Sequence, residues 1–150
     1  MEISSTDFET KSPEELIQWT IDQYGLKAGL ACSFGMEDMI LIDMIAKLKG
    51  PITIFTLDTG RLHEETYEIM EKVRSHYGLE IKTYFPNLEQ VEKLVQKKGF
   101  FSFRESIENR KECCAIRKIE PLNRALGELD AWVTGLRSDQ SITRSNTPKV

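Results

Sequence analysis

Strand-like and helix-like patterns alternate along almost the whole chain, and this alternation restricts the fold more than any other feature. Strands are expected at residues 29–34, 52–57, 80–85 and 131–135, where β-branched, aromatic or other apolar residues follow one another. Helices are expected from Ser12 to Tyr24, from Met36 to Gly50, over 63–78 and 88–98, and across 105–126. The alternation predicts an α/β fold with a parallel sheet and right-handed crossovers.

The fourth strand follows a long excursion of two helices. This excursion fits a sheet of strand order 3-2-1-4 with helices on both faces. In such a sheet the winding direction reverses between the first and the fourth strand, and ligands bind beyond the carboxyl ends of the strands at the reversal. The residues that follow strands one, two and four are therefore the candidates for a functional site.

The length and charge of the chain exclude several classes of protein. A chain of 150 residues suits one domain, so residues 1–150 are expected to form a single unit. A net charge of -4 argues against nucleic acid as the main partner but allows a local cationic pocket. No apolar run reaches the about 20 residues of a membrane span, and the polar start "MEISSTDFET" is unlike a signal peptide. Three cysteines without an export signal indicate the reducing cytoplasm.

The turn after the first strand, Ser33-Phe34-Gly35, opens the helix that begins at Met36. Backbone N–H groups at such a turn favour an anion. The same residues also fit an ordinary connection in which Gly35 serves only the backbone conformation. Neither GxxxxGK[ST] nor GxGxxG occurs, which excludes the common NTPase loop and the dinucleotide fingerprint.

The second and fourth strands are also followed by polar and cationic residues. Five residues follow the second strand without a break: Leu57, Asp58, Thr59, Gly60 and Arg61. Arg137 and Arg144 follow the fourth strand. Arginines at this edge predict a phosphate- or sulfate-bearing nucleotide bound by backbone amides and guanidinium groups. Two interpretations of Asp58 are equally supported: an acceptor for an adenine amine or ribose, or a cap of the following helix.

The segment "HEETY" at 63–67 differs from the HExxH zinc motif, because Tyr67 stands where the second His is required. His63 and His76 are expected at the surface of one helix. No zinc site is therefore predicted there.

Two adjacent cysteines, Cys113 and Cys114, lie in the helical stretch "RKECCAIRK". Neighbours on a helix point about 100° apart, so both cannot bind one tetrahedral zinc without distortion. An iron–sulfur cluster is larger and offers two corners at which the two thiolates could bind. A four-iron cluster usually needs four cysteine ligands, and the third cysteine of the chain, Cys32, is expected inside the first strand. A small buried hydrophobe is the alternative role for a free cysteine. The cations Arg117 and Lys118 favour a thiolate role, because positive neighbours lower the pKa of a thiol.

Four segments together closely resemble the assimilatory sulfonucleotide reductases: "ACSFGMEDM", "LDTGRLHEETY", "KECCAIRKIEPL" and "TGLRSDQSITR". They run from residue 31 to residue 144 in the family's order and spacing. The paired cysteines resemble the adenylylsulfate (APS) branch rather than the phosphoadenylylsulfate (PAPS) branch. The resemblance implies an adenine-nucleotide α-hydrolase-like fold, with residues 33–38 at the position of its "SGGxDS"-type pyrophosphate loop. Phe34 departs from that general pattern but agrees with the reductases.

The resemblance also implies roles for individual residues. The phosphosulfate would be bound by Ser33, Phe34 and Gly35, and the nucleotide pocket would be lined by Leu57, Asp58, Thr59, Gly60 and Arg61. Arg137 and Arg144 would bind the anion. Cys113 and Cys114 would be two of the four ligands of a [4Fe-4S] cluster, with Lys118 between cluster and substrate.

The activity implied is the reduction of APS to sulfite and AMP, dependent on thioredoxin or glutaredoxin, in sulfate assimilation and cysteine biosynthesis. In the family a tail cysteine attacks the sulfonate sulfur, and thioredoxin then releases sulfite by thiol exchange. The CxxC that completes the cluster and the ECGxH-like motif of the nucleophile do not occur before Val150. The domain is therefore expected to be incomplete at its C-terminus and the chain inactive alone.

Three alternatives remain open at this point. One is a PAPS reductase without the cluster, which the cysteine pair disfavours. Another is a nucleotide-binding module without reductase activity. The third is an ATP pyrophosphatase or sulfurylase relative, which Phe34 and the cysteine pair disfavour. The sequence leaves open the choice between APS and PAPS and whether the protein forms a homo-oligomer.

Overall fold

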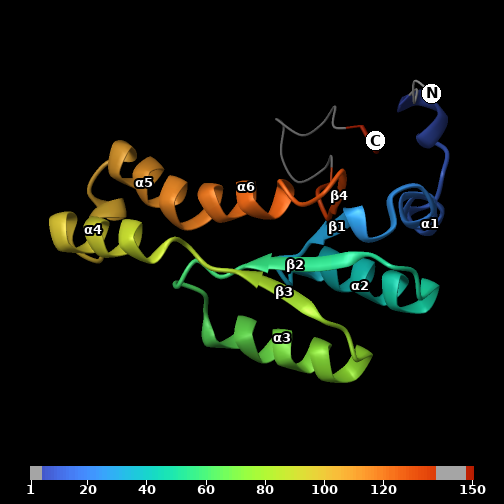
Figure 1. The fold of residues 1–150 in the computed structure, drawn as a ribbon, viewed down its shortest axis with the longest axis horizontal. Coiled ribbons are helices and arrows are strands. Elements are labelled where there is room, and N and C mark those ends of the chain that lie inside the picture. The colour runs from blue at the N-terminus through green and yellow to red at the C-terminus, as the bar shows by residue number, and fades with distance from the viewer. Residues whose placement is uncertain (1–4, 138–147) are drawn as a thin grey trace.

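The computed structural model describes residues 5–137 and 148–150. Four strands form one parallel sheet in the order β3-β2-β1-β4 (Figure 1). The strands are β1 (Ala28–Ala31), β2 (Thr53–Leu57), β3 (Ile81–Tyr84) and β4 (Ala131–Thr134). The predicted α/β class and the strand order 3-2-1-4 are confirmed.

Helices connect the strands and cover both faces of the sheet. They are α1 (Pro13–Tyr24), α2 (Met36–Leu48), α3 (Glu64–Tyr77), α4 (Leu88–Lys98), α5 (Ile107–Cys114) and α6 (Glu120–Leu126). Short 3₁₀ segments lie at Ser5–Phe8, Gly25–Lys27 and Ser102–Arg104, and a π-helical turn at Ala115–Ile119 joins α5 to α6. Figure 1 shows α2 and α3 on one side of the sheet and α6 on the other. Within the described ranges, no helix combines the length and apolar character that a membrane crossing requires.

Helix α1 begins with a capping box. The Ser12 hydroxyl accepts the N–H of Glu15 at 3.2 Å, and the Glu15 carboxylate accepts the N–H of Ser12 at 2.7 Å. Pro13 fits the first helical position because an N–H there would have no partner within the helix. One turn later the buried Ile17 and Ile21 pack into the core, where each contributes about 1.5–3 kcal/mol of burial free energy.

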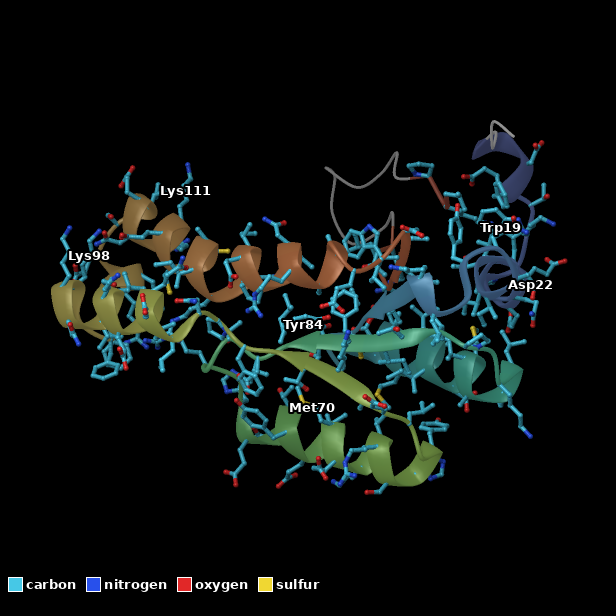
Figure 2. The ribbon with its side chains drawn as sticks, viewed as in Figure 1. Trp19, Asp22, Met70, Tyr84, Lys98 and Lys111 are labelled. Atoms are coloured by element: carbon cyan, nitrogen blue, oxygen red, sulfur yellow. The ribbon has the colours of Figure 1, made fainter. Side chains whose placement is uncertain are left out.

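The main core lies between the sheet and helices α1, α2 and α3. Its buried members are Ile17, Ile21, Leu30, Cys32, Phe34, Ile42, Ile45, Ile54 and Val73. On the other face Phe55 and Tyr84 pack edge to face, with ring centroids 6.0 Å apart, and Tyr84 lies between the sheet and α6 (Figure 2). A Cβ on Gly29 would lie only 2.4 Å from the side chain of Leu129, so a larger residue there would force Leu129 to shift.

The first strand ends three residues earlier than the sequence predicts. The Cys32 N–H still donates to the Phe55 carbonyl at 2.8 Å, but the next N–H, that of Ser33, donates to the Asp38 carboxylate at 2.6 Å. Phe34 then takes a positive φ of 61°, which no strand residue adopts. The side chain of Asp38 therefore ends the sheet pairing and turns the chain into α2.

The helical stretch predicted across 105–126 contains α5, the π-helical turn and α6. Pro121 explains the wider turn, because proline has no N–H and its ring would collide with the carbonyl four residues earlier, that of Arg117. Widening the backbone at Ala115–Ile119 accommodates the ring without ending the helix. Such π-helical turns occur frequently at functional sites.

Candidate functional site

A pocket of about 530 Å³ lies at the carboxyl ends of β1, β2 and β4. The reversal of winding between β1 and β4 predicts a ligand at this edge. Small-molecule sites usually have volumes of about 300–1,000 Å³. A groove of about 640 Å³ beside α4 is larger, but none of the predicted site residues lines it. We therefore treat the pocket at the strand ends as the candidate site and call it the strand-end pocket.

Four of the predicted site residues line the strand-end pocket: Ser33, Leu57, Thr59 and Lys118. They come from the turn after β1, from the end of β2, from the turn after it and from the π-helical turn. Gly135 and Leu136, which follow β4, complete the wall on that side. The fold thus brings together side chains that lie far apart in the sequence.

The turn after β1 is organised by Asp38, which the sequence analysis did not single out. Both the N–H and the hydroxyl of Ser33 donate to one Asp38 oxygen, at 2.6 and 2.7 Å. Asp38 is only 6% exposed, and a Cβ on Gly135 would lie 2.6 Å from its other oxygen. Gly135 therefore lets the end of β4 approach this carboxylate. Phe34 packs into the main core, and neither it nor Gly35 lines the pocket.

The turn after β2 is organised by a second buried carboxylate, that of Asp58. One Asp58 oxygen accepts the N–H of Gly60 at 2.7 Å, and both oxygens lie 3.0 Å from the donating hydroxyl of Tyr67. The N-cap residue of α3 is His63, so the interpretation of Asp58 as the helix cap is wrong. Neither Asp58 nor Gly60 lines the strand-end pocket.

Arg61 contacts the α4–α5 connection rather than the pocket. Its guanidinium donates to the carbonyl of Phe100 and lies over the rings of Phe103 and Phe101, 4.8 and 5.6 Å from their centroids. These contacts tie the turn after β2 to the segment that precedes the paired cysteines.

Arg117, in the π-helical turn, is a buried cation that contacts the turn after β2. It is 8% exposed, and its Nη1 donates to the carbonyl of Thr59 at 2.9 Å. Its Nε has no hydrogen-bond partner among the described residues. In the sequence, Arg117 stands out only as a cation beside the paired cysteines. The signal that marks its position is Pro121, four residues further on, which causes the π-helical turn.

Of the two arginines predicted to bind an anion after β4, the structure describes Arg137. The guanidinium of Arg137 lies 3.0 Å from the carboxylate of Glu37, a residue that lines the strand-end pocket. Arg144 lies outside the described residues. The Arg137 side chain is therefore placed at the rim, next to the start of α2.

The three thiols occupy contrasting environments. Cys32 is 5% exposed, and burial raises the pKa of its thiol to about 12, with the Asp38 carboxylate adding to the rise. Cys113 is half-buried and Cys114 exposed, both in the last turn of α5 and both unpaired. Across residues 5–137 and 148–150 no three His, Cys, Asp or Glu side chains gather in a way that could hold a metal ion. The assignment of Cys113 and Cys114 as ligands of a [4Fe-4S] cluster stays a prediction.

The phosphoadenosine phosphosulfate reductase domain family matches residues 27–150 of the chain. The adenosine 5'-phosphosulfate reductase of Allochromatium vinosum is 48% identical over 118 residues, which are 79% of this chain and 46% of that protein. The 5'-adenylylsulfate reductase 1, chloroplastic, of Arabidopsis thaliana is 45% identical over 143 residues, 95% of this chain and 30% of that protein. The chain spans about half the length of the bacterial relative.

A solved structure shares the fold. It is the phosphoadenylyl-sulfate reductase of Candida auris in complex with phosphate, with a TM-score of 0.78 and 25% identity. The likeness covers 93% of this chain and 71% of that chain. The sequence match and the shared fold agree, and the chain therefore belongs to the phosphoadenosine phosphosulfate reductase domain family, the sulfonucleotide reductases.

Proposed function

We propose that this chain is the nucleotide-binding part of a reductase that converts APS to sulfite and AMP. The strand-end pocket is the observation that carries the proposal, because Ser33, Thr59 and Lys118 meet there from three separate segments. The relatives named as APS reductases support the choice of substrate.

The charged end of the substrate would lie at the start of α2. The N-terminus of a helix carries partial positive charge and free N–H groups, and the N-cap residue Gly35 has no side chain that competes for them. Lys118 in the pocket and Arg137 at its rim would add positive charge, together with Arg144. Leu57 and Thr59 would contact the nucleoside.

Cys113 and Cys114 would supply two of the four thiolates of a [4Fe-4S] cluster. Their adjacent places at the end of α5, one turn before the pocket residue Lys118, support this assignment. When bound, the cluster would add localised charge beside the substrate. The other two ligands would come from the rest of the protein.

The reaction would need a nucleophilic cysteine from the rest of the protein. Its thiolate attacks the sulfonate sulfur, the bond from sulfur to the phosphate oxygen breaks, and AMP leaves with the electron pair. A thiol of reduced thioredoxin or glutaredoxin then attacks the S-sulfocysteine and releases sulfite, and its second thiol resolves the mixed disulfide. We propose the cytoplasm as the compartment, where free thiols such as those of this chain stay reduced.

PAPS is the second candidate substrate. The matching family and the structurally similar Candida auris enzyme are both named for PAPS. A preference of the purified chain for PAPS over APS would favour this candidate.

Calorimetric titration of the 150-residue chain with AMP, APS and PAPS tests the proposal. AMP and APS should bind, and Lys118→Ala should weaken APS binding about tenfold or more, because a hydrogen bond to a charged group is worth about 1.5–3 kcal/mol. Lys111→Ala is the matched control, since Lys111 is exposed on α5 and does not line the pocket. The absence of any adenine-nucleotide binding would refute the proposal.

A further inference from the structure

The hydroxyl of Tyr67 and the carboxylate of Asp58 form a contact that the proposed reaction does not use. Tyr67 lies in the first turn of α3 and donates its hydroxyl proton to Asp58, 3.0 Å from each carboxylate oxygen. Asp58 is 7% exposed, and the same carboxylate accepts the N–H of Gly60 at 2.7 Å. A helix side chain thus fixes a loop carboxylate, and that carboxylate fixes the backbone two residues further on.

The backbone conformation at Gly60 depends on this contact. Gly60 has a φ of 71°, in the left-handed region, and its N–H would lack this acceptor if Asp58 rotated away. An aspartate that accepts the N–H two residues ahead closes a tight turn. Thr59 lies inside that turn and lines the strand-end pocket.

Two further bonds make the position of Thr59 depend on the same turn. Its hydroxyl accepts the N–H of Arg61 at 3.2 Å, and its carbonyl accepts Nη1 of the buried Arg117 at 2.9 Å. A shift of the turn would therefore move a pocket residue and leave a buried guanidinium short of an acceptor, which carries a free-energy cost.

We infer that Tyr67 and Asp58 are positioning residues that hold the Leu57–Arg61 turn in the shape required to bind the nucleotide. The role of these residues in nucleotide binding rests on the proposed function, whereas their role in holding the turn rests on the structure alone. Asp58 acts through the Gly60 N–H rather than by touching the substrate. Burial and the neighbouring Asp58 raise the pKa of Tyr67, so its hydroxyl stays a donor across the neutral range.

The test compares Tyr67→Phe with Tyr77→Phe in the 150-residue chain. Tyr77 is a matched control, because it lies on the same helix and donates its hydroxyl to another carboxylate, that of Asp43, at 3.2 Å. Without nucleotide, hydrogen exchange of the Gly60 amide should accelerate about threefold to tenfold in Tyr67→Phe, as expected for one lost hydrogen bond. It should stay unchanged in Tyr77→Phe.

Nucleotide affinity provides the second measurement. AMP binding should weaken about threefold to tenfold in Tyr67→Phe and at least as much in Asp58→Asn. The double variant should bind no more weakly than Asp58→Asn, because both changes act through one carboxylate. Losses of AMP affinity that add in the double variant would overturn the inference. So would a Tyr67→Phe variant whose Gly60 exchange and AMP affinity equal those of Tyr77→Phe. If the wild-type chain binds no AMP, the proposed function fails, while the Gly60 exchange still decides whether Tyr67 holds the turn.

Discussion

Ser33 donates its backbone N–H and its hydroxyl to the same carboxylate oxygen of Asp38, at 2.6 and 2.7 Å. The resemblance to the reductases assigns these donors to the phosphosulfate, so a protein carboxylate already occupies them. A substrate anion at the start of α2 must then either displace Asp38 or bind through other donors. The positive charges of Lys118 and Arg137 become correspondingly important for the proposed binding.

Replacing Asp38 by Asn should destabilise the fold. The amide oxygen of Asn could still accept the two hydrogen bonds of Ser33, but without the negative charge that strengthens them, so the loss should be about 1–3 kcal/mol. Urea unfolding measures the change in the free energy of unfolding. Asp43→Asn on the same helix is the control and should have a smaller effect, because the Asp43–Lys47 pair is solvent-exposed and the Asn oxygen can still accept the hydroxyl of Tyr77. Equal unfolding midpoints for the two variants would contradict a structural role for Asp38.

Replacing Gly60 by Ala should reduce both stability and nucleotide binding. Gly60 has a positive φ of 71°, and a Cβ there would lie 3.2 Å from Nη1 of Arg117. The left-handed conformation alone costs a residue with a Cβ about 1–2 kcal/mol. Gly78→Ala separates the two effects, because Gly78 has a φ of 64° and nothing within 4 Å of the added carbon. Both variants should lose stability in thermal unfolding, and only Gly60→Ala should lose affinity for AMP.

Arg137 and Glu37 should influence anion binding in opposite directions. They form an ion pair at 3.0 Å beside the strand-end pocket. Arg137→Ala should weaken APS binding by about 1–3 kcal/mol if the guanidinium contacts the substrate anion. Glu37→Gln removes a negative charge that competes for Arg137 and should strengthen binding. Calorimetry that gives both variants the wild-type affinity would remove this pair from the site.

The architecture could be predicted from the sequence because its signals are local and repeated. Alternating strand and helix patterns predicted the sheet order, and the Ser12–Glu15 capping box predicted the start of α1. Helix α2 also starts at the predicted residue, Met36, after the Gly35 turn. In each case short-range chemistry and the tertiary fold favour the same conformation.

The details of the site depend on contacts that no local pattern encodes. The first strand was predicted too long because the apolar residues Cys32 and Phe34 stand on either side of Ser33, while the Asp38 carboxylate ends the pairing from the next helix. Arg61 was expected in the pocket, but its guanidinium lies over Phe103, far along the chain. Tyr67 attracted notice only as a missing zinc ligand, because its partner Asp58 becomes visible once the fold brings them together.

The thiol of Cys32 should make stability depend on alkaline pH. Burial raises its pKa from 9.0 to about 12, so the folded state binds the thiol proton more tightly than the unfolded state. The resulting stability is fully present below about pH 9 and is lost as the pH rises towards about 12. Urea unfolding at a series of pH values should show a steeper alkaline loss for the wild type than for Cys32→Ala. Parallel pH dependences for the wild type and Cys32→Ala would contradict the assignment of the alkaline loss to the Cys32 thiol.

The 150-residue chain should release no sulfite from APS, even with reduced thioredoxin. Cys32 is buried with a pKa of about 12 and is therefore a poor nucleophile at neutral pH. Cys113 and Cys114 lie in the last turn of a helix, which cannot carry a thiol from the substrate to thioredoxin. Sulfite release by the purified chain is the measurement, with a full-length relative as positive control. Thioredoxin-dependent turnover that disappears in one of the three Cys→Ser variants would identify that cysteine as the nucleophile, and the roles proposed for the thiols would then be wrong.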